Sequence, residues 1–165
     1  MRSIYKTLAS GLALGVLLSA CGGGSDSPEP TPLNASLTVS GSSDINLNGV
    51  YSTTALNISA VEKNNPIGGD PEVCSFRFSG LGQAGSQRLM DGDIRYIPGT
   101  SELRVVFVSI SGVEFNSRTP AAAVVDKAGN QVNFTAKPLS ASSGNGSAIA
   151  ISGSLPMRTG RPEGC

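Results

Sequence analysis

Apolar and polar residues alternate along several short segments of the chain, and a period of two is typical of half-buried β-strands. Long runs at helical spacing are absent, whereas Gly, Ser, Thr and Asn are abundant. Leu103–Ile110 is a denser apolar run, which predicts a central strand covered on both sides. The alternating segments that we expect to form strands are Ala35–Val39, Leu56–Ala60, Val73–Phe78, Ile94–Ile97, Val132–Ala136 and Ala148–Leu155.

Turn-forming residues separate these segments. Asp126–Asn130 predicts a hairpin turn in which Gly129 adopts the left-handed conformation, and Pro98–Ser101 predicts another turn. Asn64–Pro71 and Ser140–Gly146 are expected to be irregular loops. About seven to nine short strands joined by turns are typical of a β-sandwich or a small barrel. We therefore predict an all-β fold, an antiparallel β-sandwich or small barrel.

The N-terminal residues have the pattern of an export signal. Arg2 and Lys6 are positive, and the apolar stretch Leu8–Leu18 is too short to span a bilayer core of about 30 Å. The following residues, Leu18-Ser19-Ala20-Cys21, resemble the lipobox of bacterial lipoproteins. In that family the cysteine thiol is acylated and the peptide is cut before the cysteine. The resemblance covers residues 1–21 and implies a lipid anchor on Cys21.

The segment after Cys21 has the composition of a tether. Gly22–Pro32 contains no apolar side chain and is rich in Gly, Ser and Pro, which make a chain flexible or extended. Such a spacer favours the lipoprotein over the alternative, an ordinary signal peptide cut near Ala20. We divide the chain into a signal peptide (1–20), a lipidated cysteine with its flexible tether (21–34) and a single β domain (35–165).

The same resemblance suggests a localisation. In many Gram-negative lipoproteins, an Asp directly after the lipidated cysteine retains the protein in the inner membrane, whereas this chain has Gly22. The resemblance implies a lipid-anchored protein of the cell envelope, at the outer membrane rather than the inner membrane. Display toward the periplasm and display at the cell surface both stay open.

Two cysteines, Cys74 and Cys165, are left after lipidation of Cys21. Exported compartments are oxidising, so we expect the pair to form a disulfide. Closing a loop of about 90 residues would stabilise the fold by about 4 kcal/mol in the chain-entropy model. The alternative is that Cys165 bridges to a partner protein.

Charge does not favour nucleic acid as a partner. The chain has 12 Lys and Arg against 12 Asp and Glu, and Arg2 and Lys6 leave with the signal peptide. Phosphate binding needs clustered cations, which the mature chain lacks. The small basic group Arg158–Arg161 is expected to be a solvated tail, with contact to an anionic lipid or glycan as the alternative.

Residue types exclude several kinds of catalysis. There is no histidine, which removes Ser-His-Asp and Cys-His sites and zinc sites that contain histidine. Lys63, Lys127 and Lys137 are expected to be solvated in turns or at strand ends, which gives no support to a Ser/Lys hydrolase. We expect no cofactor and no enzymatic activity, with a carboxylate-based hydrolase as the least favoured hypothesis.

Two carboxylates remain as candidate ligands. Asp91 and Asp93 flank Gly92 and could bind Ca²⁺ through oxygen, although we expect a polar turn here, before a strand that starts at Ile94. The few aromatic residues fall mostly in core-facing registers, so a platform for stacking sugars is not predicted. The leading hypothesis is a membrane-anchored binding or structural module for another envelope protein. The alternative is a Ca²⁺- or glycan-binding module that uses the Asp91/Asp93 turn.

The lipid anchor is testable in the full chain. We expect a Cys21→Ala variant to be neither lipidated nor membrane-associated, because the thiol that carries the lipid is missing. Detergent phase partition should place the native protein in the detergent phase and the variant in the aqueous phase. A variant that still fractionates with membranes would contradict the assignment.

Overall fold

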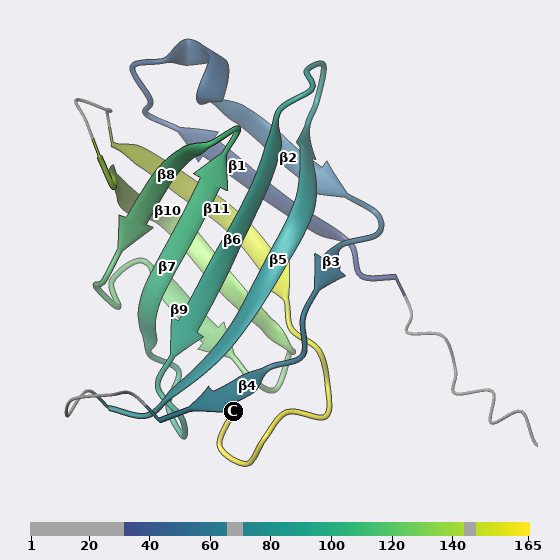
Figure 1. The fold of residues 1–165 in the computed structure, drawn as a ribbon, viewed down its shortest axis with the longest axis vertical. Coiled ribbons are helices and arrows are strands. Elements are labelled where there is room, and N and C mark those ends of the chain that lie inside the picture. Colours follow the sequence, from purple (N-terminus) through teal and green to yellow (C-terminus); the bar gives the residue numbers. More distant parts are fainter. Residues whose placement is uncertain (1–31, 66–70, 144–147) are drawn as a thin grey trace, which may run out of the picture. The chain divides into compact units, whose positions relative to one another are not determined.

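Eleven β-strands and one 3₁₀ turn make up the residues that the computed structural model describes, which are 32–65, 71–143 and 148–165 (Figure 1). The predicted signal peptide, Cys21 and most of the tether lie outside these residues, as do parts of both predicted irregular loops. The elements are β1 (Ala35–Ser40), η1 (Ile45–Leu47), β2 (Gly49–Thr53), β3 (Asn57–Ile58), β4 (Glu62–Asn64), β5 (Val73–Gln83), β6 (Leu89–Tyr96), β7 (Leu103–Ile110), β8 (Val113–Ser117), β9 (Ala123–Asp126), β10 (Gln131–Ala141) and β11 (Ile149–Pro156).

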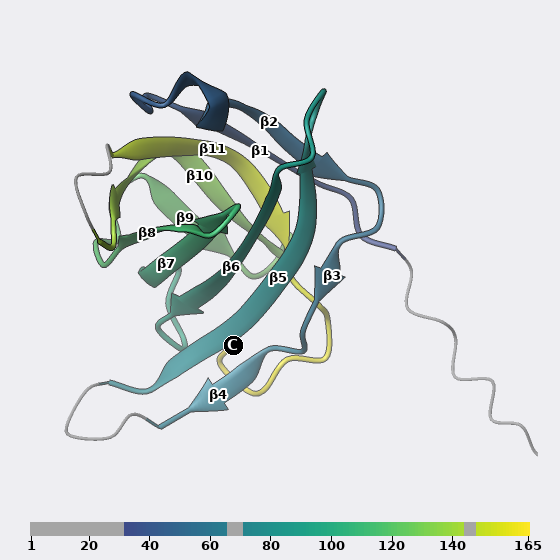
Figure 2. The same cartoon turned by 45° about the horizontal axis from the view of Figure 1, so that its top comes forward.

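Eight of these strands form a closed barrel. Around the wall the order is β1-β2-β5-β6-β7-β8-β10-β11, and β11 pairs with β1 to close the ring. Every neighbouring pair is antiparallel, and β3, β4 and β9 pair outside this ring with β5 or β10. In Figures 1 and 2, β5–β8 form the near wall and β1, β10 and β11 lie behind them. The predicted all-β antiparallel fold is confirmed in its barrel form.

Side chains fill the barrel interior, as the diameter of an eight-stranded barrel allows. Alternate residues of most wall strands are buried, which is the pattern detected in the sequence. The largest side chains with less than 2% exposure include Tyr51, Tyr96, Phe76, Phe115, Leu37, Leu81, Met90 and Ile94. Burial of each large apolar side chain contributes about 1.5–3 kcal/mol. The interior therefore acts as the hydrophobic core.

Strand β6 corrects one prediction. It begins at Leu89, so Asp91 and Asp93 lie within a strand and not in a turn. Met90, Ile94 and other alternate residues face the core, whereas the two carboxylates face outward. Pairing with β5 and β7 along the whole of β6 outweighs the local turn preference of the Asp-Gly-Asp sequence.

The predicted hairpin turn between β9 and β10 is present, but its left-handed residue is Asn130, with φ of 53°, and not Gly129. Gly129 has a different role. Its N–H donates to Oδ1 of Asp126 over 2.8 Å, and a Cβ at this position would lie 2.3 Å from Oδ2. A side chain at position 129 would therefore have to displace the Asp126 carboxylate.

Two buried tyrosines fix segments outside the strands. Tyr51 donates from its hydroxyl to the carbonyl oxygen of Leu47 in η1 over 2.9 Å, and Tyr96 donates to that of Cys165 over 2.8 Å. Burial raises the pKa of both phenols, so both stay protonated donors at neutral pH.

A disulfide joins Cys74 in β5 to Cys165, which confirms the predicted pairing within the chain. The two residues are 91 positions apart, so the expected stabilisation of about 4 kcal/mol applies to this bond.

The segment after β11 is held against the barrel, so the expected solvated tail is wrong. The Arg161 guanidinium donates to the carbonyl oxygens of Lys127 (2.9 Å) and Cys165 (3.1 Å) and to Oδ1 of Asn130 (2.7 Å). Arg158 donates from Nε to the carbonyl oxygen of Ile58 over 3.0 Å. These two arginines thus join the segment after β11 to β3 and to the turn between β9 and β10.

Lys137 in β10 differs from another prediction. Lys137 is fully buried at 0% exposure, although the sequence predicts a solvated lysine. Its ammonium donates to the carbonyl oxygens of Thr119 (2.6 Å) and Ala121 (2.8 Å) and to the Thr119 hydroxyl (3.0 Å). Three acceptors thus match three N–H donors, while burial lowers the pKa of the ammonium.

A local irregularity explains why Lys137 points inward. The pairing of β10 with β11 shifts register between Phe134 and Lys137, and Ala136 within this stretch has φ of 48°. Such a bulge changes which residues of a strand face the core. Lys137 consequently lies on the same face as the buried residues Phe134 and Leu139.

Candidate functional site

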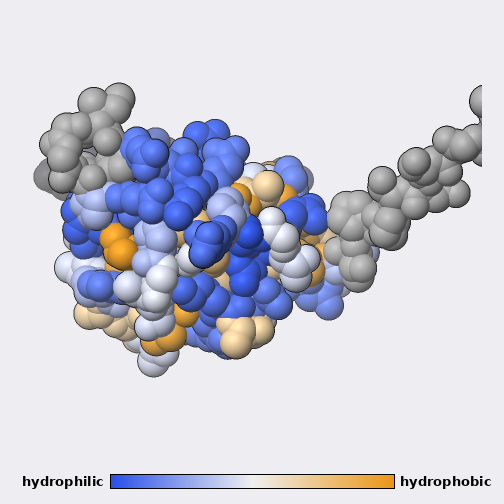
Figure 3. Space-filling view, turned by 90° about the horizontal axis from the view of Figure 1, so that it is seen from below, coloured by the Kyte–Doolittle hydropathy of each residue, from blue (hydrophilic) through white to orange (hydrophobic). Residues whose placement is uncertain are grey.

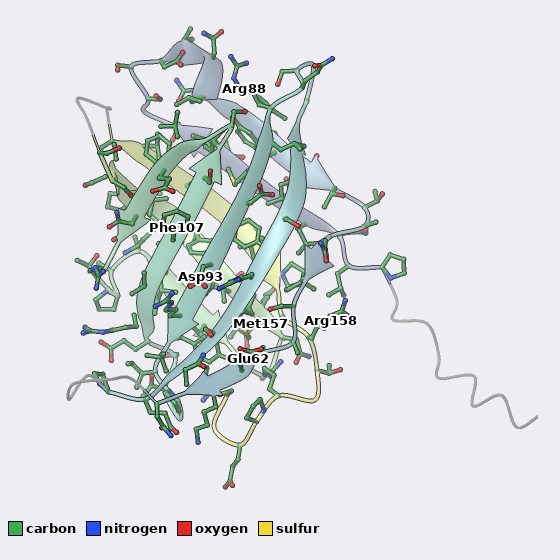
Figure 4. The ribbon with its side chains drawn as sticks, viewed as in Figure 1. Glu62, Arg88, Asp93, Phe107, Met157 and Arg158 are labelled. Carbon is green, nitrogen blue, oxygen red and sulfur yellow. A yellow bond between two sulfur atoms is a disulfide. The ribbon has the colours of Figure 1, made fainter. Side chains whose placement is uncertain are left out.

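An open groove of about 860 Å³ crosses the outer face of β5, β6, β7 and β8. This is the near wall in Figure 4, where Phe107 and Asp93 are labelled on it. Its volume falls within the range of about 300–1,000 Å³ typical of ligand sites. The expectation that β7 is covered on both sides is therefore wrong, because its outward side chains line this groove.

Strand register brings four outward side chains into one row across the groove. Arg77 of β5 pairs with Asp93 of β6. Asp93 in turn pairs with Phe107 of β7, and Phe107 pairs with Asn116 of β8. Phe107 is half-buried, whereas the other aromatic residues in the described part of the chain are buried. Its ring is therefore the aromatic surface available to a ligand.

A second row lies next to the first. Arg95 of β6 pairs with Val105 of β7, and Arg118 follows Ser117, whose partner is Val106. Arg118 is thus expected at the level of Val105, and both line the groove. Val105 and Phe107 form an apolar strip along β7 with guanidinium groups on both sides.

The acidic groups of the groove already have partners. Oδ1 of Asp93 lies 2.8 Å from Nε of Arg95, and Oδ2 lies 3.7 Å from Nε of Arg77. Asp93 is 18% exposed, whereas the Arg77 side chain is 83% exposed. Asp91 accepts a hydrogen bond from the Gly80 N–H over 3.1 Å.

The guanidinium groups of the groove retain unused donors. Across residues 32–65, 71–143 and 148–165, the side chain of Arg118 makes no hydrogen bond or ion pair, and the side chain of Arg77 makes no hydrogen bond. With three arginines against two aspartates, the groove carries a positive excess.

Sequence reasoning identified only part of this site. It selected Asp91 and Asp93, which share the outward face of β6, but it missed Arg77, Arg95 and the ring of Phe107. Period-two alternation extended through Asp91, Asp93 and Arg95 could have predicted one outward face. No group of three or more His, Cys, Asp or Glu able to hold a metal ion occurs in the part of the chain that the structure describes.

Other surfaces of the described residues are weaker candidates for a binding site. A smaller hollow of about 420 Å³ adjoins the groove at Arg77 and Arg95 and is bordered by Glu62. The end of the barrel seen in Figure 3 is mostly hydrophilic, with hydrophobic residues in small separate groups. Among the described residues, no helix has the length and hydropathy needed to cross a membrane. The groove on β5–β8 is the strongest candidate site.

The chain matches no protein-family model, no curated protein and no solved structure, so its geometry alone carries the functional argument.

Gly92 permits the close packing beneath the groove. A Cβ at this position would lie 2.4 Å from the carbonyl oxygen of Phe107 and 2.6 Å from the ring of Phe78. By contrast, the nearest atom to a Cβ at Gly82 of β5 is a backbone oxygen at 3.9 Å. The two glycines form a matched pair for substitution.

We expect Gly92→Ala to lower the free energy of unfolding by about 2 kcal/mol, because the methyl group forces β6 and β7 apart. Gly82→Ala should change it by less than about 0.5 kcal/mol. Urea unfolding of both variants measures the two free energies of unfolding. Equal values would show that the space at Gly92 can accept a methyl group.

Proposed function

We propose that this chain is a non-enzymatic binding module of the cell envelope, held at a membrane by lipid on Cys21, and that its ligand occupies the groove on β5–β8. The observation that carries the proposal is the apolar strip of Val105 and Phe107 between guanidinium groups with unused donors. An aromatic face with few convergent polar groups is typical of ligand sites.

The filled core supports an external site. Large side chains such as Tyr51, Phe76 and Phe115 occupy the barrel interior at less than 2% exposure. A ligand inside would have to displace this core at a cost of several kcal/mol. Binding to the outer wall leaves the core intact.

Contacts of the two carboxylates favour binding over hydrolysis. A glycosidase-type mechanism needs one carboxyl group that donates a proton and a second that acts as base or nucleophile. Asp93 instead faces a guanidinium on each oxygen, and Asp91 is held by a backbone N–H. The same ion pairs do not favour Ca²⁺ at Asp93, because the arginines compete for its oxygens.

The proposed lipid anchor would hold the binding module at a membrane. Each CH₂ of an acyl chain that is buried in a membrane contributes about 0.8 kcal/mol, and two or more chains hold a protein stably. A tether of Gly, Ser and Pro would leave the barrel free to present its groove. Outer-membrane attachment remains part of this proposal.

Site-specific photocrosslinking in intact cells tests the groove. A photoreactive residue in place of Ser109, which lines the groove, should give an adduct, whereas one in place of Thr38 on the opposite wall should not. The adduct at position 109 should disappear with Arg77→Glu plus Arg118→Glu, since reversing charge removes the donors.

Arg88→Glu is the matched control, because Arg88 lies near one end of the barrel, away from Phe107 and Asp93 (Figure 4). It should leave the adduct unchanged. Equal adducts from positions 109 and 38 would refute the groove as the binding surface. An adduct at position 109 that persists with Arg77→Glu plus Arg118→Glu would refute it as well.

A further inference from the structure

We infer that the ligand of the groove is an acidic oligosaccharide, whose ring packs on Phe107 and whose carboxylate binds Arg95 and Arg118. This inference rests on the proposed function and names its ligand class. Three features of the groove carry it: the order of its side chains along β7, its charge, and the pairing of its backbone.

The order along β7 divides the groove into three levels. Val105 lies between Arg95 and Arg118, Phe107 lies next to Asp93, and Ser109 pairs with Asp91. Alternate residues of a strand are about 6.6 Å apart, so the three levels span about 13 Å. That span suits two to three sugar rings.

Each level offers a different chemistry. The first supplies guanidinium donors, which bind carboxylates through charge-assisted hydrogen bonds. The second supplies the half-buried ring of Phe107, and an aromatic face packs against the apolar face of a sugar. The third supplies the Asp91 carboxylate and the Ser109 hydroxyl, which accept from sugar hydroxyls.

Charge favours an acidic sugar over a neutral one. The whole chain has as many acidic as basic residues, whereas the groove has three arginines against two aspartates. Asp93 is neutralised by its two arginine contacts, which leaves Arg118 without an anion among the described residues. A carboxylate on the ligand would complete this pairing.

Backbone pairing favours a saccharide over a peptide. The groove lies on the face of a sheet, where β6 is paired on both edges with β5 and β7, so a peptide cannot add to it as another strand. Only Val105 and Phe107 form the apolar strip, which offers little to anchor apolar peptide side chains. Hydroxyl, amide, carboxylate and guanidinium groups suit sugar hydroxyls, which both donate and accept.

Calorimetric titration of the detergent-solubilised full lipoprotein tests the inference. The probes are trigalacturonate, triguluronate and disialic acid as acidic oligosaccharides, maltotriose as the neutral control, and hexaglutamate as the acidic peptide. We expect at least one acidic oligosaccharide to bind at least tenfold more tightly than maltotriose or hexaglutamate.

Arg118→Gln and Phe107→Ala should each weaken that binding at least tenfold, and Arg88→Gln should leave it unchanged. Arg118→Gln is the sharper variant, since its side chain has no partner in the described chain whose loss could unfold the barrel.

Maltotriose or hexaglutamate binding as tightly as the acidic oligosaccharides would overturn the inference. Failure of all the acidic oligosaccharides to bind, with the photoadduct at position 109 still present, would overturn the ligand class and leave the groove as a binding surface. Loss of the position-dependent photoadduct as well would overturn the proposed function itself.

Discussion

A closed β-barrel must also hold the connections between its strands, and in this chain a buried ammonium in β10 binds the connection from β8 to β9. The connection from β8 to β9 leaves the carbonyl oxygens of Thr119 and Ala121 outside the sheet, and Lys137 binds both. Without these acceptors, the buried ammonium of Lys137 would be left unsatisfied, at a cost of about 1–3 kcal/mol or more. Because Arg118 is the neighbour of Thr119, this contact also holds the chain next to one side of the groove.

The filled interior and the external groove are two consequences of one alternating pattern. Inward residues of β6 and β7 pack the core, and the outward residues between them form the rows of the groove. Gly92 allows the ring of Phe78 to lie beneath β6 without displacing the wall. A rigid wall of this kind can present fixed side chains to a ligand with little loss of entropy on binding.

Much of this fold is predictable from local signals, and the exceptions have physical causes. Leu103–Ile110 forms β7 with the predicted bounds, because a dense apolar run admits few alternatives, and the oxidising compartment predicts the Cys74–Cys165 pair. The start of β6 was missed because Asp91-Gly92-Asp93 has turn chemistry that sheet pairing overrides. The groove was missed because its rows depend on register across four strands, which no local pattern of one strand encodes.

Hydrogen exchange in a Lys137→Met variant tests most directly whether the buried ammonium holds the β8–β9 connection and, through it, the groove. The account predicts that the variant stays folded while the amides of Val125 and Thr135, which donate to the carbonyl oxygens of Ser101 and Ala122, exchange at least tenfold faster than in the native protein. The amides of β1 and β2 should be unchanged. Lys63→Met, which removes an exposed lysine paired with Glu72, should leave the exchange of Val125 and Thr135 as it is. Unchanged exchange at Val125 and Thr135 in Lys137→Met would contradict the account.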